Sequence, residues 1–225
     1  DYRQKLLSKS DKLNANHFHI IRIGYDETLF SIQSPVRQEI FTVTYSGSIA
    51  DFYQPDIFFS AFGKIRKRYP DIAFRLEFAG ILSDGIRKMA AENNLSDIFI
   101  ETGYLSHQEA VKKICQATIL LLVNPVTRNE KMVIPGKIYE YLAAMKPVCN
   151  ITVTDAETAD ILAKNKAGET FNRNMEDQLT VWLENKVEVW KKNGNLDIVN
   201  DGAKAYSIRS IALQLDSEVL EDLLN

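Results

Sequence analysis

A regular alternation of strand-like and helix-like segments between Phe41 and Phe171 constrains the fold more than any other feature. Short apolar or alternating segments, bounded by Gly, Pro, Asn or Ser, are each followed by a longer segment with apolar residues at helical spacing. Residues 117–123 are almost entirely apolar, which is typical of a strand covered on both faces. The alternation therefore predicts an α/β fold, a Rossmann-like doubly wound parallel sheet with helices on both faces.

The expected elements follow from the same patterns. We expect strands at residues 18–23, 41–46, 72–79, 98–101, 117–123, 148–152 and 167–171. We expect helices at residues 1–13, 55–69, 84–93, 106–116, 135–146, 156–164, 175–192 and 203–224. Ser106 followed three residues later by Glu109 predicts a capping box. The buried face of the helix after Pro135 is predicted from its spacing to consist of Ile138, Tyr141, Leu142 and Met145.

The bulk composition excludes several classes of protein. The formal net charge is -3 at pH 7, which gives no support for a nucleic-acid surface. Cys115 and Cys149 lie far apart in apolar surroundings, so we expect buried thiols in a reducing, cytoplasmic compartment. No apolar run in the sequence is long enough to span a bilayer, and no signal peptide is visible.

Motifs for other chemistries are missing. His17, His19 and His107 are too scattered for a metal site or a catalytic triad, and no D-x-D-like metal motif occurs. The sequence has no G-x-S-x-G, P-loop or G-x-G-x-x-G pattern, which argues against hydrolase, NTPase and dinucleotide-binding functions. We therefore expect neither a metal nor a cofactor.

The segment from Pro135 to Glu140 has the chemistry of a phosphate and sugar site. Pro135 and Gly136 turn the chain and leave free N–H groups at the start of a helix, where anions are favoured, and Lys137 adds a positive charge. Glu140, one turn further, can accept hydrogen bonds from ribose hydroxyls. The alternative is a capped amphipathic helix in which Lys137 and Glu140 are merely solvated.

The predicted sheet also indicates where a ligand would lie. In an open parallel sheet, ligands bind beyond the carboxyl ends of the strands. The loops there include Gly47–Ser48, Gly80 and Gly103–Leu105, and glycine at a strand end lets a ligand approach the backbone.

Residues Lys137 to Val148 resemble the nucleotide-sugar motif of the retaining glycosyltransferases of group 1, or family 4, which have the GT-B fold. Tyr45–Ser48, Phe78–Gly80, Thr102–Leu105 and Asn124–Pro125 precede it in the order that the family shows. The resemblance covers most of the chain from about residue 20 to residue 171 and implies a donor-binding C-terminal half.

The resemblance also implies roles for individual residues. Glu140 would hold the ribose of a UDP-, GDP- or ADP-sugar, and the segment Pro135–Gly136–Lys137 would face the diphosphate. Gly47–Ser48 would approach the diphosphate as well, and Tyr104–Leu105 would lie against the nucleobase. The substrate-binding set that we expect is Gly47, Ser48, Gly80, Tyr104, Leu105, Pro135, Gly136, Lys137 and Glu140, and no catalytic residue is assigned.

The same resemblance predicts a domain organisation. Residues 1–30 would be an interdomain segment left from a missing N-terminal half, 31–172 the nucleotide-sugar-binding domain, and 173–225 a helical extension. The chain begins at Asp1 without Met, so we expect a piece of a longer protein. The whole protein would transfer a sugar to a glycan or lipid-linked acceptor in polysaccharide biosynthesis, at the inner face of the membrane if the missing half binds there. This chain alone would bind nucleotide and be inactive.

Several positions depart from the family pattern. Many members have Arg directly after the glycine matching Gly47, and Lys five residues further on, where this chain has Ser48 and Tyr53. A glutamate expected eight positions before Glu140 falls on Met132. Glu130 is near that position but out of register.

One hypothesis and two alternatives accompany these departures. Arg128 and Lys131, in the loop before the helix, could replace the lost positive charge. A degenerate scaffold module without catalysis, with the helix of Trp182 and Trp190 as its contact surface, stays open. A sugar-nucleotide epimerase of the same architecture also stays open, although the acidic and His residues expected at its cleft are not found.

Overall fold

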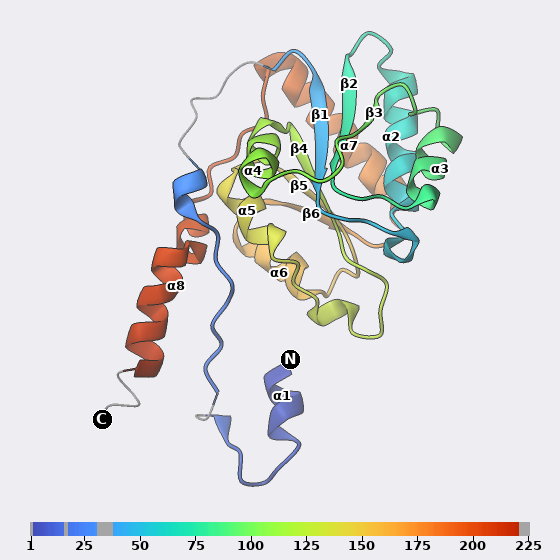
Figure 1. Ribbon diagram of the computed structural model, residues 1–225. Coiled ribbons are helices and arrows are strands. Elements are labelled where there is room, and N and C mark those ends of the chain that lie inside the picture. Colours follow the sequence, from blue (N-terminus) through green and yellow to red (C-terminus); the bar gives the residue numbers. More distant parts are fainter. Residues whose placement is uncertain (1, 16–17, 31–37, 221–225) are drawn as a thin grey trace.

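The computed structural model describes residues 2–15, 18–30 and 38–220. Asp1, His17 and residues 221–224 of the last expected helix lie outside this description. The part from residue 41 to residue 193 forms a doubly wound sandwich, and Figure 1 shows α1 and α8 standing away from it.

A single sheet of parallel strands forms the middle layer, as the sequence predicts. Its order is β3-β2-β1-β4-β5-β6, so the chain winds outward from β1 in one direction and from β4 in the other. The strands are β1 (Phe41–Ser46), β2 (Phe74–Ala79), β3 (Phe99–Glu101), β4 (Ile119–Val123), β5 (Val148–Ile151) and β6 (Gly168–Phe171).

Helices cover both faces of this sheet. The α-helices are α1 (Tyr2–Leu7), α2 (Asp56–Arg68), α3 (Asp84–Glu92), α4 (His107–Gln116), α5 (Lys137–Ala143), α6 (Glu157–Lys164), α7 (Glu176–Asn193) and α8 (Ile208–Leu215). Short 3-10 helices occupy Glu27–Leu29, Asp51–Tyr53, Glu130–Met132 and Asp201–Tyr206, and Asp216–Leu220 is a π-helical turn. The predicted capping box of α4 is present: the Ser106 side chain accepts from the Glu109 amide and the Glu109 carboxylate accepts from the Ser106 amide.

The all-apolar sequence of β4 explains how the layers are held. Ile119, Leu121 and Val123 pack into one core with residues of α2, α3 and α7. Leu120 and Leu122 point to the other face and pack into a second core with residues of α4, α5 and α6. Alternate residues of one strand thus bury apolar area on both sides, which is why the strand tolerates no polar residue.

Helix α7 packs against the body, and both of its tryptophans contact other rings of this chain. Trp190 is buried, with its ring in edge contact with Phe41. Trp182 is half-buried and its ring meets Phe171 edge-on. Trp190 is therefore used in this chain's own core, and Trp182 keeps part of its surface exposed.

The expected strand at residues 18–23 is wrong. These residues are extended but pair with no strand, since no sheet edge lies beside them among the described residues. The N-terminal backbone first bonds to a distant part of the chain at Tyr25, whose amide donates to Tyr206 O and whose carbonyl accepts from the Ile208 amide, at 2.9 Å each. The N-terminal segment and the start of α8 therefore pair here in a short parallel bridge between Tyr25 and Ser207.

Several helix boundaries differ from expectation. Helix α1 ends at Leu7 rather than at residue 13, and the helix expected at 203–224 is divided into a 3-10 helix, α8 and a π-helical turn. Of the two cysteines expected to be buried, Cys149 is buried and Cys115 is half-buried. Met145 is not on the buried face of α5: it lies beyond the end of the helix with φ of 55° and is 36% exposed. Helical spacing predicts a face only as far as the helix continues.

Candidate functional site at the strand switch point

The Tyr141 side chain separates the two central strands at their carboxyl ends. Register pairs between β1 and β4 end at Thr44 and Leu120. Beyond them the Tyr141 hydroxyl accepts a hydrogen bond from the Ser46 amide at 3.0 Å and donates one to Leu121 O at 3.2 Å. The phenol therefore keeps both backbone groups bonded where the strands part. This is the switch point of the sheet, the position at which open α/β sheets bind ligands.

Lys137, at the start of α5, reaches across this switch point. Its Nζ lies 4.0 Å from the centroid of the Tyr45 ring on β1, a cation–π contact. A Cβ atom on Gly47 would lie only 2.8 Å from the same nitrogen, so the glycine leaves the space that the amine occupies. Within the described residues the ammonium makes no hydrogen bond. Burial lowers the pKa of Lys137 to about 8, and the nearby Glu140 carboxylate opposes this shift only in part.

The backbone before α5 adds two donors at the same place. The amides of Gly136 and Lys137 have no acceptor within the described part of the chain, and the first closed turn runs from the Ile138 amide to Pro135 O at 3.0 Å. Gly136 is exposed and Pro135 is half-buried. Unbonded amides beside a desolvated ammonium form an arrangement suited to an anion.

Glu140 lies one turn further along α5 and faces α4. Its Oε1 is 2.6 Å from Nε2 of His107, the first residue of α4. The Glu140 side chain is 21% exposed and that of His107 is 60% exposed. Sequence spacing did not connect these two residues, which lie 33 positions apart.

The loops after β1 and β2 are packed against each other. A Cβ on Gly80 would lie 2.2 Å from Gly47 O, so the glycine at the end of β2 is required by the close approach of the two backbones. The Tyr45 hydroxyl donates to Ser48 O at 3.1 Å and fixes the loop after β1. The space beside Gly80 is therefore filled by this chain's own backbone.

The remaining expected residues follow β3. Tyr104 is 87% exposed and Leu105 is half-buried. Both belong to the segment that leads into His107, but no hydrogen bond or ring contact joins them to Lys137 or Glu140 among the described residues. The structure thus brings Gly47, Gly80 and Lys137 into contact, places Glu140 close to Lys137, and leaves Tyr104 at the edge of the group.

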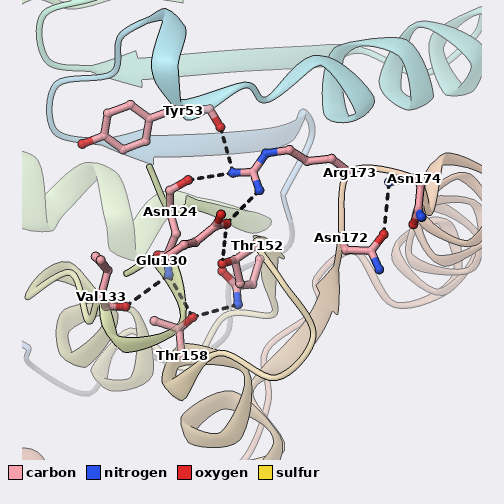
Figure 2. Close-up of polar contacts among 10 residues, drawn as sticks. Tyr53, Asn124, Glu130, Val133, Thr152, Thr158, Asn172, Arg173 and Asn174 are labelled. Carbon is pink, nitrogen blue, oxygen red and sulfur yellow. Dashed lines mark hydrogen bonds and ion pairs between the residues drawn. The ribbon is translucent and has the colours of Figure 1, made fainter. Parts of the chain in front are cut away.

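A buried ion pair fastens the neighbouring loops (Figure 2). Arg173, two residues after β6, donates from Nη1 to Glu130 Oε1 at 2.7 Å, and from Nη2 to Tyr53 O and Asn124 O at 3.1 and 2.9 Å. The buried Thr152 hydroxyl donates to the same Glu130 oxygen at 2.9 Å. The carboxylate of Glu130, which lies near the glutamate position of the family pattern but out of register, therefore points into the protein interior.

Sequence reasoning missed Arg173, although a signal existed. A charged residue two positions after a strand end lies at the edge of a parallel sheet where ligands bind. Lys131 and Arg128, the two cations that could replace the missing charge, differ in their contacts. Lys131 forms an exposed ion pair with Asp155, and Arg128 is exposed.

Other candidate sites are less suitable. A cavity of about 900 Å³ lies between residues 18–23, α6 and Tyr139, and Gly47, Lys137 and Glu140 do not line it. No group of three or more His, Cys, Asp or Glu in the described residues could hold a metal ion. In the same residues, no helix has the length and apolar character needed to cross a membrane.

Known proteins match this chain in fold only. No protein-family model and no curated protein matches its sequence. The lipopolysaccharide outer core galactosyltransferase WaaB, in its apo form, matches with a TM-score of 0.70 at 11% identity, over 98% of this chain and 59% of WaaB. Anabaena HepE, solved with UDP and glucose, matches with a TM-score of 0.67 at 14% identity, over 91% of this chain and 57% of HepE.

A third structure shows which part of such enzymes the chain resembles. The C-terminal domain of the group 1 glycosyltransferase LpcC from Francisella tularensis matches with a TM-score of 0.56 at 16% identity, over 88% of this chain and 98% of that domain. The chain spans less than two thirds of WaaB and HepE but nearly all of the isolated domain. Its fold is therefore that of the C-terminal half of GT-B glycosyltransferases.

Proposed function

We propose that this chain is the donor-binding domain of a glycosyltransferase and binds a nucleoside diphosphate sugar at the switch point. The fold supports this, because a solved structure with the same fold, HepE, holds UDP and glucose. The single observation that carries the proposal is the environment of the Lys137 ammonium. The ammonium is desolvated, lacks a hydrogen bond within the described residues, and lies beside Gly47 where the two central strands part.

The chemistry of glycosyl transfer gives these groups their tasks. As the bond between the sugar and the diphosphate breaks, negative charge builds on the leaving oxygen. The Lys137 ammonium and the free amides of Gly136 and Lys137 stabilise that charge. Glu140 accepts hydrogen bonds from the ribose hydroxyls, and the segment Tyr104–Leu105 meets the nucleobase.

The remaining parts of the reaction come from outside this chain. An N-terminal half of the same protein supplies the acceptor site, for a glycan or a lipid-linked sugar in the cytoplasm. Residues 1–30 connect that half with the domain 31–172, and residues 173–225 form the extension. The parallel bridge between Tyr25 and Ser207 supports this division, since it brings the connecting segment and the extension together.

Calorimetric titration of the chain with UDP, GDP and ADP tests the proposal. We expect one of them to bind, and Glu140→Ala to weaken that binding by roughly 1.5–3 kcal/mol, the contribution of a hydrogen bond to a charged group. Glu92→Ala, at the exposed end of α3, is the matched control and should leave affinity unchanged. Unchanged affinity in Glu140→Ala would exclude the ribose role.

A non-catalytic scaffold is the second candidate. Ser48 and Tyr53 stand where the family places cations, which favours this alternative. In that case none of the three nucleotides would bind, although the wild-type chain would be folded. The titration therefore separates the two functions directly.

A further inference from the structure

Glu140 has a neighbour with the chemistry to orient it. His107 Nε2 and Glu140 Oε1 lie 2.6 Å apart although 33 positions separate the residues in sequence. An ionised carboxylate only accepts hydrogen bonds, so the shared hydrogen belongs to the imidazole Nε2. We propose that His107 is a positioning residue that turns the Glu140 carboxylate toward the ribose hydroxyls. This inference rests on the proposed function.

A capping box supports the backbone at His107. It is the first residue of α4 and directly follows the capping-box residue Ser106. The Glu109 carboxylate accepts from the Ser106 amide at 3.0 Å and from its hydroxyl at 2.6 Å. These bonds hold the start of α4, so the imidazole projects from a backbone with little freedom to move.

The other carboxylate oxygen is left for a ligand. Glu140 Oε2 has no hydrogen-bond partner among the described residues, and the side chain is 21% exposed. A carboxylate with one oxygen held and the other accessible has a fixed acceptor direction, which lowers the entropy lost on binding. His107 itself is 60% exposed and forms the solvent side of the pair.

The arrangement links two parts of nucleotide recognition. Tyr104 and Leu105, which we place against the nucleobase, precede His107 by two or three positions on the same segment. This segment would therefore contact the base and, through His107, set the direction of the group that contacts the ribose. Discrimination between ribose and deoxyribose then depends on a residue that need not touch the sugar.

The test compares a ribonucleotide with a nucleotide that lacks the ribose hydroxyls. The tightest binder among UDP, GDP and ADP is titrated into the chain alongside its 2′,3′-dideoxy counterpart. We expect His107→Ala to weaken ribonucleotide binding about fivefold to tenfold, the effect of one lost orienting hydrogen bond, and to reduce the ribo-over-dideoxy preference by the same factor. His107→Gln, which keeps an N–H donor, should restore most of the preference.

The controls separate this inference from the proposed function. His19→Ala, at an exposed histidine of the N-terminal segment, should leave both titrations unchanged. If Glu140→Gln abolishes the preference but His107→Ala keeps it, the positioning role is overturned and the proposed function stands. If His107→Ala weakens both ligands equally, the role is overturned too. If the wild type binds no nucleotide, both ideas fail.

Discussion

Replacement of Arg173 by Met should be the most damaging single change near the site. Arg173 forms a 2.7 Å ion pair with Glu130, whose side chain is only 9% exposed, and also donates to two backbone carbonyls. Methionine keeps an apolar stem of similar length but no charge, so Glu130 would remain buried without its cation. Breaking a buried pair in this way costs about 3–5 kcal/mol, a large fraction of the 5–15 kcal/mol that stabilises a typical domain.

Urea unfolding followed by tryptophan fluorescence measures this cost. The double variant Arg173→Met/Glu130→Gln removes the stranded charge, so we expect it to be more stable than Arg173→Met alone, with a coupling energy of about 2–3 kcal/mol. Arg68→Met is the matched control: its partner is Glu184 and its side chain is 63% exposed, so the loss should stay below about 1 kcal/mol. A cost below about 1 kcal/mol for Arg173→Met, or additive single effects, would refute the reasoning.

Three further predictions concern the residues of the switch point. Because burial lowers the pKa of Lys137 to about 8, the ammonium is lost as pH rises through that value. Nucleotide affinity measured by calorimetry should then fall up to about tenfold per pH unit above 8, whereas Lys137→Arg, which stays charged, should bind independently of pH over pH 7–10. Tyr141→Phe leaves a buried amide and a buried carbonyl without a hydrogen-bond partner and should lower the free energy of urea unfolding by about 1–3 kcal/mol. Tyr104→Phe, at an exposed ring, should leave that free energy almost unchanged. Gly80→Ala forces two backbones apart and should lower the melting temperature far more than Gly103→Ala, where φ is also positive but no atom lies within 4 Å of the added Cβ.

Local sequence signals predicted the central sheet well. The span of β1, Phe41–Ser46, and the capping box at Ser106 agree with expectation, because alternating apolar and polar residues and a reciprocal side-chain cap are encoded within a few residues. The expected strand at residues 18–23 failed for the opposite reason. A strand needs a neighbour, and the sequence of the segment does not reveal whether one is available.

The candidate site was predicted only where its residues are close in sequence. Lys137 and Glu140 share one turn of α5, so spacing alone places them together. His107 and Arg173 reach the site from α4 and from the end of β6, and their partners, Glu140 and Glu130, lie 33 and 43 positions away. Single-sequence periodicity carries no information on such contacts, which are set by the order of strands in the sheet.

The packing of the short helix α5 explains how a phosphate site with a single lysine could work here. Lys137, Glu140 and Tyr141 lie close together on α5 but contact different parts of the fold. Lys137 contacts β1, Glu140 contacts α4, and Tyr141 lies between β1 and β4. Tyr141 is buried and hydrogen-bonded to both strands, so rotation of the helix would leave backbone groups of β1 and β4 without a hydrogen-bond partner. The Lys137 amine is therefore held at the switch point by a neighbour that never meets the ligand. An amine held in place, desolvated and without a competing carboxylate bond interacts more strongly with an anion than a flexible surface cation does. Under the proposed function, one such group with two free amides would supply part of the positive charge that Ser48 and Tyr53 lack.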